Sequence, residues 1–295
     1  MGNFTRKTIA LADGDVSYLE WEAVAPLLLF AHATGFNAET YRGMLTPLQG
    51  RFRVTAVDQR GHGFTKLPAS PGPQADWTTF GQDLARILET LDGAPAVLAG
   101  HSMGAVTSMM VAAARPNLVR GLVLVEPVLV PRFSRQLAGV MRWLGRGPPP
   151  GTDLAAMAAK RRAIFPSFEM AVSAYRGRGA FKTWPDDTVA DYLRGGLIST
   201  GNGTEMRLAC DPLWESSIFQ HAPPGGARLA SNVRCPITVI YSPVSNTTRD
   251  REVGIVMRRH RDVRVVRVPE TTHFLPMERP DVVQFEIERM LRKTA

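Results

Sequence analysis

Cysteine is scarce in this chain of 295 residues, where Cys210 and Cys235 are the only two. Neither stands at metal-ligand spacing from the other or from a pair of histidines, so the sequence offers neither a disulfide framework nor a zinc motif. No apolar run reaches the roughly 18 residues of a membrane span. The N-terminus lacks the apolar core of a signal peptide. We therefore expect reduced thiols, a cytoplasmic protein that engages no membrane, and no metal or organic cofactor.

A concentrated basic tract is also missing, although Lys and Arg number 35 against 27 Asp and Glu, a net charge of +8. The arginines are scattered and are not interleaved with aromatic residues, as they would be in a nucleic-acid-binding stretch. Such a surface is solvated and mildly attractive to anions. We expect a small-molecule substrate and no nucleic-acid partner, and no segment determines the oligomeric state.

Eight short segments are typical of β-strands. Residues 4–11 and 16–22 flank an Asp-Gly turn and predict a hairpin. Six nearly uninterrupted apolar runs follow, as expected of strands buried on both faces of a parallel sheet. These runs are 26–32, 52–58, 94–100, 119–126, 236–242 and 263–269. Helical segments at 77–91, 103–116 and 280–293 alternate with them. The pattern predicts an α/β fold with a doubly wound, mostly parallel eight-stranded sheet.

One interval interrupts this alternation. Residues 131–221 hold no convincing buried strand. Helix-like pieces lie around 134–144, 153–164, 167–176 and 186–196. We interpret the interval as an inserted helical cap, with residues 1–130 and 222–295 forming the core.

Ser102 stands between two glycines in the stretch Gly100-His101-Ser102-Met103-Gly104, after a predicted strand and before a predicted helix. In that context Gly-x-Ser-x-Gly is a nucleophile elbow, a turn so tight that small residues must flank the serine. The alternative is a plain strand-to-helix turn. A serine nucleophile needs a base, a group that orients the base, and donors for the developing oxyanion.

His273 is the candidate base. Of the six histidines it is the one in the loop after the last predicted strand, from which a side chain can reach the C-terminal edge of a parallel sheet. The alternative is a capping or packing histidine. The elbow itself supplies the Met103 amide as one oxyanion donor, and the loop 32–37 is expected to supply the second. Small residues in that loop let the backbone approach a substrate closely.

Four motifs, in this order, resemble those of the α/β-hydrolase superfamily. They are HATGF at 32–36, similar to its oxyanion loop, VDQRGHGFT at 57–65, similar to its loop after the fourth strand, GHSMG at 100–104, and THF at 272–274. The resemblance covers nearly the whole chain and implies the α/β-hydrolase fold. It also implies that the Thr34 amide is the second oxyanion donor. Ala33 departs from the glycine that the family most often has there.

The acid of the expected triad is the difficult member. The family's usual Asp follows the seventh strand, and here Ser245 occupies that place, where it cannot carry a negative charge. Glu126 ends the strand 119–126 among apolar residues that would make an unpaired carboxylate costly. Some α/β-hydrolases, notably many haloalkane dehalogenases, resemble this arrangement. Asp250 is the other candidate, although it reads as a first-turn helix residue. We favour Glu126; its alternative role is an ion pair with a cap arginine such as Arg132.

A serine nucleophile implies acyl transfer to water, so we expect a carboxylesterase for small to medium acyl or aryl esters, acting through an acyl-enzyme. Lactones and thioesters are compatible with the same chemistry. Phe36 and Phe274 adjoin the catalytic positions, and Trp214 lies where the cap re-enters the core, so these three are candidate substrate contacts. Two alternatives stay open: a carbon–carbon bond hydrolase that binds a substrate carboxylate with cap arginines, and a catalytically decayed scaffold that binds a ligand.

Overall fold

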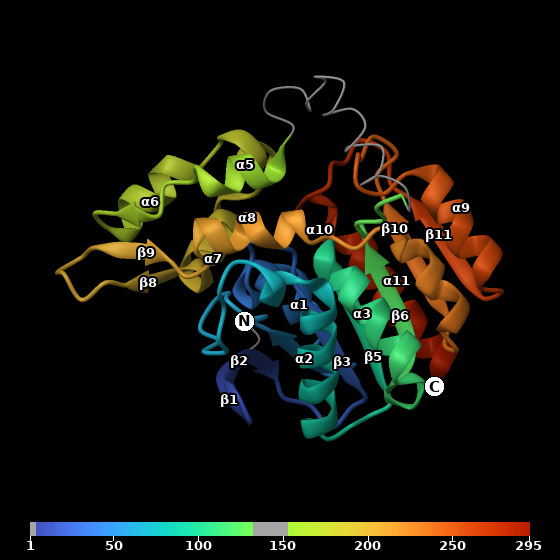
Figure 1. Cartoon of the computed structure of the whole chain (residues 1–295). Coiled ribbons are helices and arrows are strands. Elements are labelled where there is room, and N and C mark those ends of the chain that lie inside the picture. Colours follow the sequence, from blue (N-terminus) through green and yellow to red (C-terminus); the bar gives the residue numbers. More distant parts are fainter. Residues whose placement is uncertain (1–3, 132–152) are drawn as a thin grey trace.

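The computed structural model describes residues 4–131 and 153–295 and contains the predicted eight-stranded sheet (Figure 1). The strands are β1 (Thr5–Leu11), β2 (Gly14–Trp21), β3 (Leu27–Ala31), β4 (Arg53–Val57), β5 (Ala96–His101), β6 (Val119–Val125), β10 (Ile237–Tyr241) and β11 (Val263–Arg267). Their order in the sheet is β1-β2-β4-β3-β5-β6-β10-β11. The pairs β1–β2 and β2–β4 are antiparallel and all the others are parallel. Each strand was predicted to within about two residues, because a strand buried on both faces leaves a continuous apolar run.

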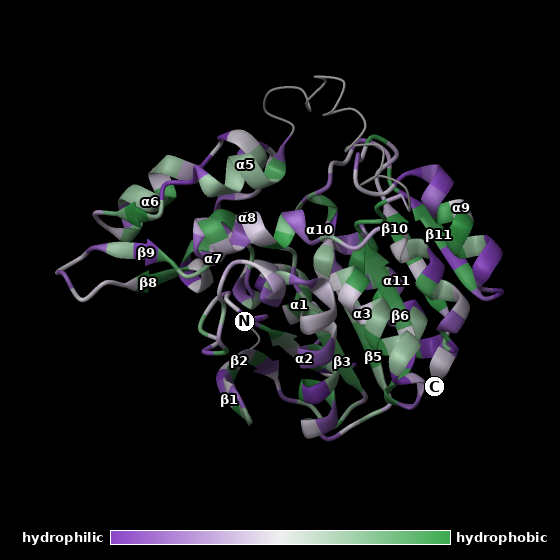
Figure 2. Ribbon diagram, viewed as in Figure 1, coloured by the Kyte–Doolittle hydropathy of each residue, from purple (hydrophilic) through white to green (hydrophobic). Residues whose placement is uncertain are grey.

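Helices cover both faces of the sheet. One face packs on α2 (Trp77–Thr90), α3 (Met103–Ala114) and α9 (Asp250–Arg259), and the other on α1 (Arg42–Leu45) and α11 (Pro280–Thr294). Strand β3 divides its side chains in the expected alternation, with Leu27 and Leu29 on the first face and Leu28 and Phe30 on the second. Figure 2 shows the central strands β5 and β6 in the colours of apolar residues, whereas β1 and α9 carry polar stretches. The sheet therefore has a core on each side.

The segment between β6 and β10 lies across one edge of the sheet (Figure 1). Its helices are α5 (Leu154–Ala159), α6 (Phe168–Tyr175), α7 (Asp186–Gly196) and α8 (Pro212–Gln220). The predicted piece at 134–144 falls outside the described residues, and the division of core from cap at 131 and 221 stays a prediction. Within residues 4–131 and 153–295, no helix combines the length and the apolar character that crossing a membrane requires.

The expectation that this segment contains no buried strand was wrong. Strands β7 (Ile164–Phe165), β8 (Leu197–Ser199) and β9 (Met206–Leu208) form a separate antiparallel sheet in the order β7-β9-β8. Phe165, Leu197 and Leu208 are buried. Strands of two or three residues are too short to establish an alternating pattern, which needs about four residues to be recognised.

Candidate active site

The turn after β5 has the strained geometry of an elbow. Ser102 adopts φ 57° and ψ −115°, a conformation that L-residues rarely hold, and its amide donates to the Val125 carbonyl oxygen at 2.9 Å. A side chain at position 100 would overlap the backbone of Gly104, and one at position 104 would overlap the Ala31 carbonyl. Both glycines are therefore required by the space available. Met103 begins α3, so its amide has no acceptor within the helix.

Three predicted residues come together above the end of the sheet. His273 Nε2 lies 3.0 Å from Ser102 Oγ, and His273 Nδ1 lies 3.2 Å from Glu126 Oε2. These are the distances that a nucleophile, base and orienting acid require. The chain order of Ser102, Glu126 and His273 is that of nucleophile, acid and base in α/β-hydrolases.

Hydrogen bonds hold both the backbone and the side chain of Glu126 in place. The residue is fully buried and holds φ 48°, a left-handed conformation that is unusual for a side chain of this size. Its amide donates to the Ile240 carbonyl at 2.8 Å, while Oε1 accepts from the Ser242 amide. Because Oε1 is held by the start of the loop after β10, Oε2 is left to face His273.

Thr247 also reaches the imidazole, and the sequence interpretation had not included it. Its Oγ1 lies 2.9 Å from His273 Nδ1, 3.4 Å from Glu126 Oε2 and 2.8 Å from Ser245 Oγ. Ser245, which occupies the position of the family's usual Asp, thus connects to His273 through the Thr247 hydroxyl. The sequence signal was only the position of this loop, since threonine carries no charge that would mark it as part of a triad.

The rival acid points elsewhere. Asp250 begins α9 and is exposed, accepting from the Tyr241 hydroxyl and pairing with Arg267 at 3.2 Å. Arg132, the proposed alternative partner of Glu126, lies outside the described residues. Among the described residues, Glu126 Oε2 contacts His273 Nδ1 and Thr247 Oγ1.

The loop after β3 leaves one amide available. Ala33, Thr34, Gly35 and Phe36 form a turn in which the Phe36 amide donates to the Ala33 carbonyl at 3.1 Å and Gly35 adopts φ +76°. The amides of Ala33 and Gly35 donate to Tyr41 Oη at 3.2 Å and to His62 Nε2 at 3.0 Å. Within the described part of the chain, the Thr34 amide is the one in this turn without an acceptor.

One hydrogen-bonded chain joins the three loops of the site. The Tyr41 hydroxyl accepts from the Ala33 amide and lies 2.7 Å from His101 Nδ1. His101 Nε2 in turn lies 2.8 Å from the His273 carbonyl oxygen, to which it donates. Burial lowers the pKa of His101 well below its usual value, so the ring is neutral and can accept at one nitrogen while donating at the other. His101, the residue before Ser102, therefore links the loop 32–36 to the loop that carries His273.

Two further histidines hold backbone amides. His32 Nε2 accepts from the Gln59 amide at 2.9 Å, and His62 Nε2 accepts from the Gly35 amide at 3.0 Å. Burial lowers the pKa of His32 to about 4 and that of His62 to about 3. Both rings stay neutral at physiological pH, which an acceptor nitrogen requires. They hold the loops after β3 and β4 in place.

We expect the free energy of unfolding to fall as the pH is lowered from about 6.5 toward 4. An unfolded histidine takes up a proton near pH 6.5, whereas His32 and His62 in the folded chain do not. The unfolded state binds more protons in this window, so each such histidine adds a slope of about 1.4 kcal/mol per pH unit. The stability is present above pH 6.5 and is lost on acidification. Chemical denaturation at intervals between pH 5 and 7 measures it.

His62→Gln supplies the matched test, because an amide oxygen can still accept from Gly35 but takes up no proton. Its slope should be smaller than that of the wild type by about 1.4 kcal/mol per pH unit. Equal slopes for wild type and His62→Gln would show that His62 does not resist protonation.

A cluster of aromatic side chains lies beside His273. The Phe36 and Phe274 rings are parallel, with centroids 6.2 Å apart, and Trp184 packs edgewise on both at 5.4 and 5.5 Å. Phe274 is 5.9 Å from the His273 ring, and Phe36 lies two residues after Thr34. Two of the predicted substrate contacts therefore lie together next to the proposed catalytic groups.

The third predicted contact, Trp214, is placed differently. It is buried in a cluster with Phe80 and Met103, and its Nε1 donates to the Arg60 carbonyl at 3.3 Å. The ring thus supports the loop after β4 and the residue after the nucleophile. Its contact with a substrate stays a prediction.

A partly buried cation, Arg161, links the segment between β6 and β10 to the loop 32–36. Arg161 pairs with Glu215 and donates to the hydroxyls of Tyr175 at 3.0 Å and Tyr192 at 2.6 Å. The Tyr192 hydroxyl then donates to the Gly35 carbonyl at 3.2 Å. Burial raises the pKa of Tyr192, so its hydroxyl keeps the proton that this bond needs. Glu215 balances the charge of Arg161, and the hydrogen bonds of the cluster hold the loop 32–36 against the segment between β6 and β10.

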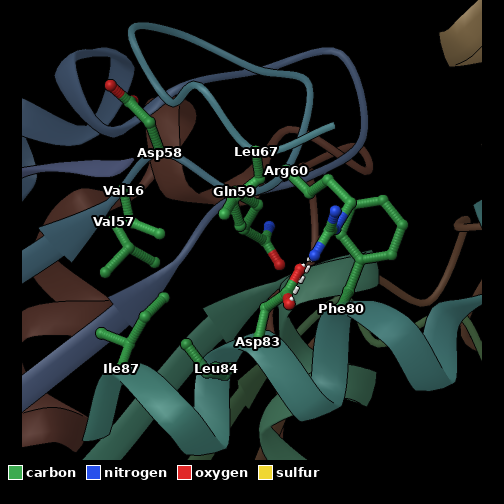
Figure 3. Close-up of a pocket in the computed structure, with 10 residues that line it drawn as sticks. All are labelled: Val16, Val57, Asp58, Gln59, Arg60, Leu67, Phe80, Asp83, Leu84 and Ile87. Atoms are coloured by element: carbon green, nitrogen blue, oxygen red, sulfur yellow. Dashed lines mark hydrogen bonds and ion pairs between the residues drawn. The ribbon is translucent and has the colours of Figure 1, made fainter. Parts of the chain in front are cut away.

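A small cavity lies beneath the loop after β4 (Figure 3). Its volume is about 10 Å³, enough for about one water molecule and too little for an ester. Its lining residues are Val16, Val57, Asp58, Gln59, Arg60, Leu67, Phe80, Asp83, Leu84 and Ile87. Arg60 and Asp83 are paired across it at 2.7 Å. Within residues 4–131 and 153–295, no group of three or more His, Cys, Asp or Glu side chains is arranged to hold a metal ion.

Comparison with known proteins identifies the family. Residues 28–284 match the profile described as Alpha/beta hydrolase family. This chain belongs to the alpha/beta hydrolase family. As an alpha/beta hydrolase it superimposes on the crystal structure of E-2-(acetamidomethylene)succinate hydrolase with a TM-score of 0.81. That match has 22% identity and covers 98% of this chain and 100% of the other, so it shows a shared fold.

Curated relatives match this alpha/beta hydrolase over shorter stretches. A 2-(acetamidomethylene)succinate hydrolase of Mesorhizobium japonicum is 39% identical over 101 residues, which are 34% of this chain and 35% of the relative. An esterase of Mycobacterium tuberculosis is 34% identical over 115 residues, 38% of this chain and 37% of the relative. The chain thus matches about a third of the length of these relatives.

Proposed function

We propose that this alpha/beta hydrolase is a carboxylesterase that cleaves small to medium acyl or aryl esters through a serine acyl-enzyme. The observation that carries the proposal is the continuous contact from Ser102 Oγ through the two nitrogens of His273 to the buried Glu126 carboxylate. Serine as nucleophile favours acyl transfer, since alkyl halide displacement would need a carboxylate at position 102.

In the proposed reaction, Ser102 Oγ attacks the ester carbonyl carbon while His273 Nε2 takes the hydroxyl proton. The carbonyl oxygen becomes an oxyanion, to which the amides of Met103 and Thr34 donate. When the intermediate collapses, the alcohol leaves with the proton from Nε2. A water molecule then attacks the acyl-enzyme by the same steps and releases the acid. Glu126 stabilises the imidazolium through the proton on Nδ1.

Two features support an apolar ester as the substrate. Phe36, Phe274 and Trp184 present aromatic surface beside the proposed catalytic groups. Arg161, a described cap arginine near the oxyanion loop, already has Glu215 as its counterion. A carbon–carbon bond hydrolase that bound a substrate carboxylate would need a cation free to pair with it, and Arg161 is not free in this sense.

The test is labelling with a fluorophosphonate, which reacts with an activated serine and mimics the tetrahedral intermediate. We expect one adduct per chain, on the peptide that contains Ser102, together with release of p-nitrophenol from p-nitrophenyl butyrate. Ser108→Ala is the matched control, because Ser108 is buried in α3 and its hydroxyl donates to the Gly104 carbonyl. It should label like the wild type. Absence of both the adduct and the ester turnover would contradict the proposal and favour a binding scaffold.

A further inference from the structure

The indole of Trp184 is an exception among the four tryptophans that lie in the described residues. Three others pair their Nε1 groups: Trp21 donates to Thr46 Oγ1 at 3.1 Å, Trp77 to the Ile218 carbonyl at 3.0 Å, and Trp214 to a backbone carbonyl as described above. Trp184 is 6% exposed, yet its Nε1 has no acceptor among the residues that the structure describes. A buried N–H without a partner destabilises the folded state, and such a group calls for an explanation.

The position of Trp184 connects it with the reaction. Its ring touches Phe274, the residue after the proposed base, and Phe36, which follows the oxyanion loop. The preceding residue, Thr183, donates to Glu278 Oε1 at 2.6 Å, and Glu278 also accepts from the Thr272 hydroxyl at 2.7 Å. The segment that carries Trp184 is thereby fastened to the loop that carries the base. The ring that carries the unpaired N–H therefore belongs to the aromatic cluster beside His273.

We infer that Trp184 Nε1–H is a substrate-binding donor. It donates a hydrogen bond to an oxygen atom of the ester other than those at the scissile bond. This inference rests on the proposed function and narrows it: the preferred substrates carry an ether or keto oxygen on the chain that lies along Phe36 and Phe274. An alkyl ester offers this N–H no acceptor. Recognition by a buried hydrogen bond discriminates more strongly than an extra methylene does.

Trp184→Phe tests the assignment, because phenylalanine keeps an aromatic ring and removes the donor. The substrates are methyl esters with an ether or keto oxygen at successive chain positions, each paired with the alkyl ester of equal length. Acid release gives kcat/KM for each. For at least one pair, we expect the variant to lose about ten- to hundredfold in kcat/KM for the oxygen-bearing ester relative to its alkyl partner. Comparing the variant with the wild type cancels the intrinsic reactivity of each ester.

Trp77→Phe is the matched control, since Trp77 is equally buried but its N–H is paired with Ile218. It should leave the preference between paired esters unchanged, even if the protein is less stable. A preference in Trp184→Phe equal to that of the wild type for every pair would overturn the inference and indicate that water satisfies the N–H.

A binding measurement separates this inference from the proposed function. In Ser102→Ala with 15N-labelled tryptophan, the indole resonance of Trp184, assigned by its loss in a Trp184→Phe double variant, should shift on addition of an oxygen-bearing methyl ester. It should shift less with the alkyl partner. A shift without ester turnover by the wild type would retain the donor and reject the esterase. Turnover with no shift for any oxygen-bearing ester would retain the esterase and reject the donor.

Discussion

Replacing Ser102 with alanine should lower kcat for p-nitrophenyl butyrate by about 10⁴-fold or more, with the fold retained. Ser102 Oγ lies 3.0 Å from His273 Nε2, so the hydroxyl is placed to lose its proton as it attacks. Removing a nucleophile leaves the binding site and the oxyanion donors, which together sustain only the residual rate that water can achieve. Initial rates from purified wild type and variant, measured side by side, give the ratio.

Folding must be checked in the same samples, because Ser102 holds a strained backbone. Alanine has the smaller side chain and should not raise the strain, so the thermal midpoint is expected to stay near or above that of the wild type. Ser108→Ala, in the next turn of the same helix, should keep most of the activity. Wild-type rates in Ser102→Ala would remove this serine from the chemistry.

Exchanging Glu126 for glutamine should cost about 10⁴-fold in kcat, the loss seen when the orienting carboxylate of a serine triad becomes an amide. The charge that stabilises the imidazolium disappears, and the amide can donate where only an acceptor suits His273 Nδ1. Asp250→Asn removes an equal charge from the exposed start of α9 and should leave kcat within about twofold, since surface ion pairs contribute little.

Thr247 offers a second way to supply the charge. Its Oγ1 is 2.9 Å from His273 Nδ1, so Thr247→Asp in the Glu126→Gln background should restore part of the lost kcat. Thr247→Asn in the same background is the control, with the same size and no charge. Equal rates in the Asp and Asn variants would mean that the position of the carboxylate, and not merely its charge, decides catalysis.

The sequence predicted the sheet, its flanking helices and the principal contacts of the site for a common reason. Strands buried on both faces leave continuous apolar runs, and the elbow needs small residues at fixed spacing because Gly104 lies against Ala31. These are local requirements, and a single stretch of sequence can display them. The contact between Ser102 and His273 joins distant positions, yet it followed from where parallel strands end.

The remaining features depend on contacts that no local pattern records. Thr247 became visible only when the β10 loop was placed beside His273, because a threonine in a polar loop resembles any other. Trp184 likewise stands out by the lack of an acceptor, which is a property of its surroundings. The short strands β7, β8 and β9 were missed because two or three residues are too few to display an alternating pattern.

The hydrogen-bonded chain through Tyr41 and His101 has a consequence for selectivity. One imidazole and the Tyr41 hydroxyl link the backbone of the loop 32–36 to that of the loop carrying His273, so the two loops are held at a fixed spacing. The polar environment is organised before a substrate arrives, so little reorganisation is needed as charge develops. If the chain is the proposed esterase, substitutions at Phe36, Phe274 and Trp184 should change kcat/KM among esters while the rate of the chemical step is preserved.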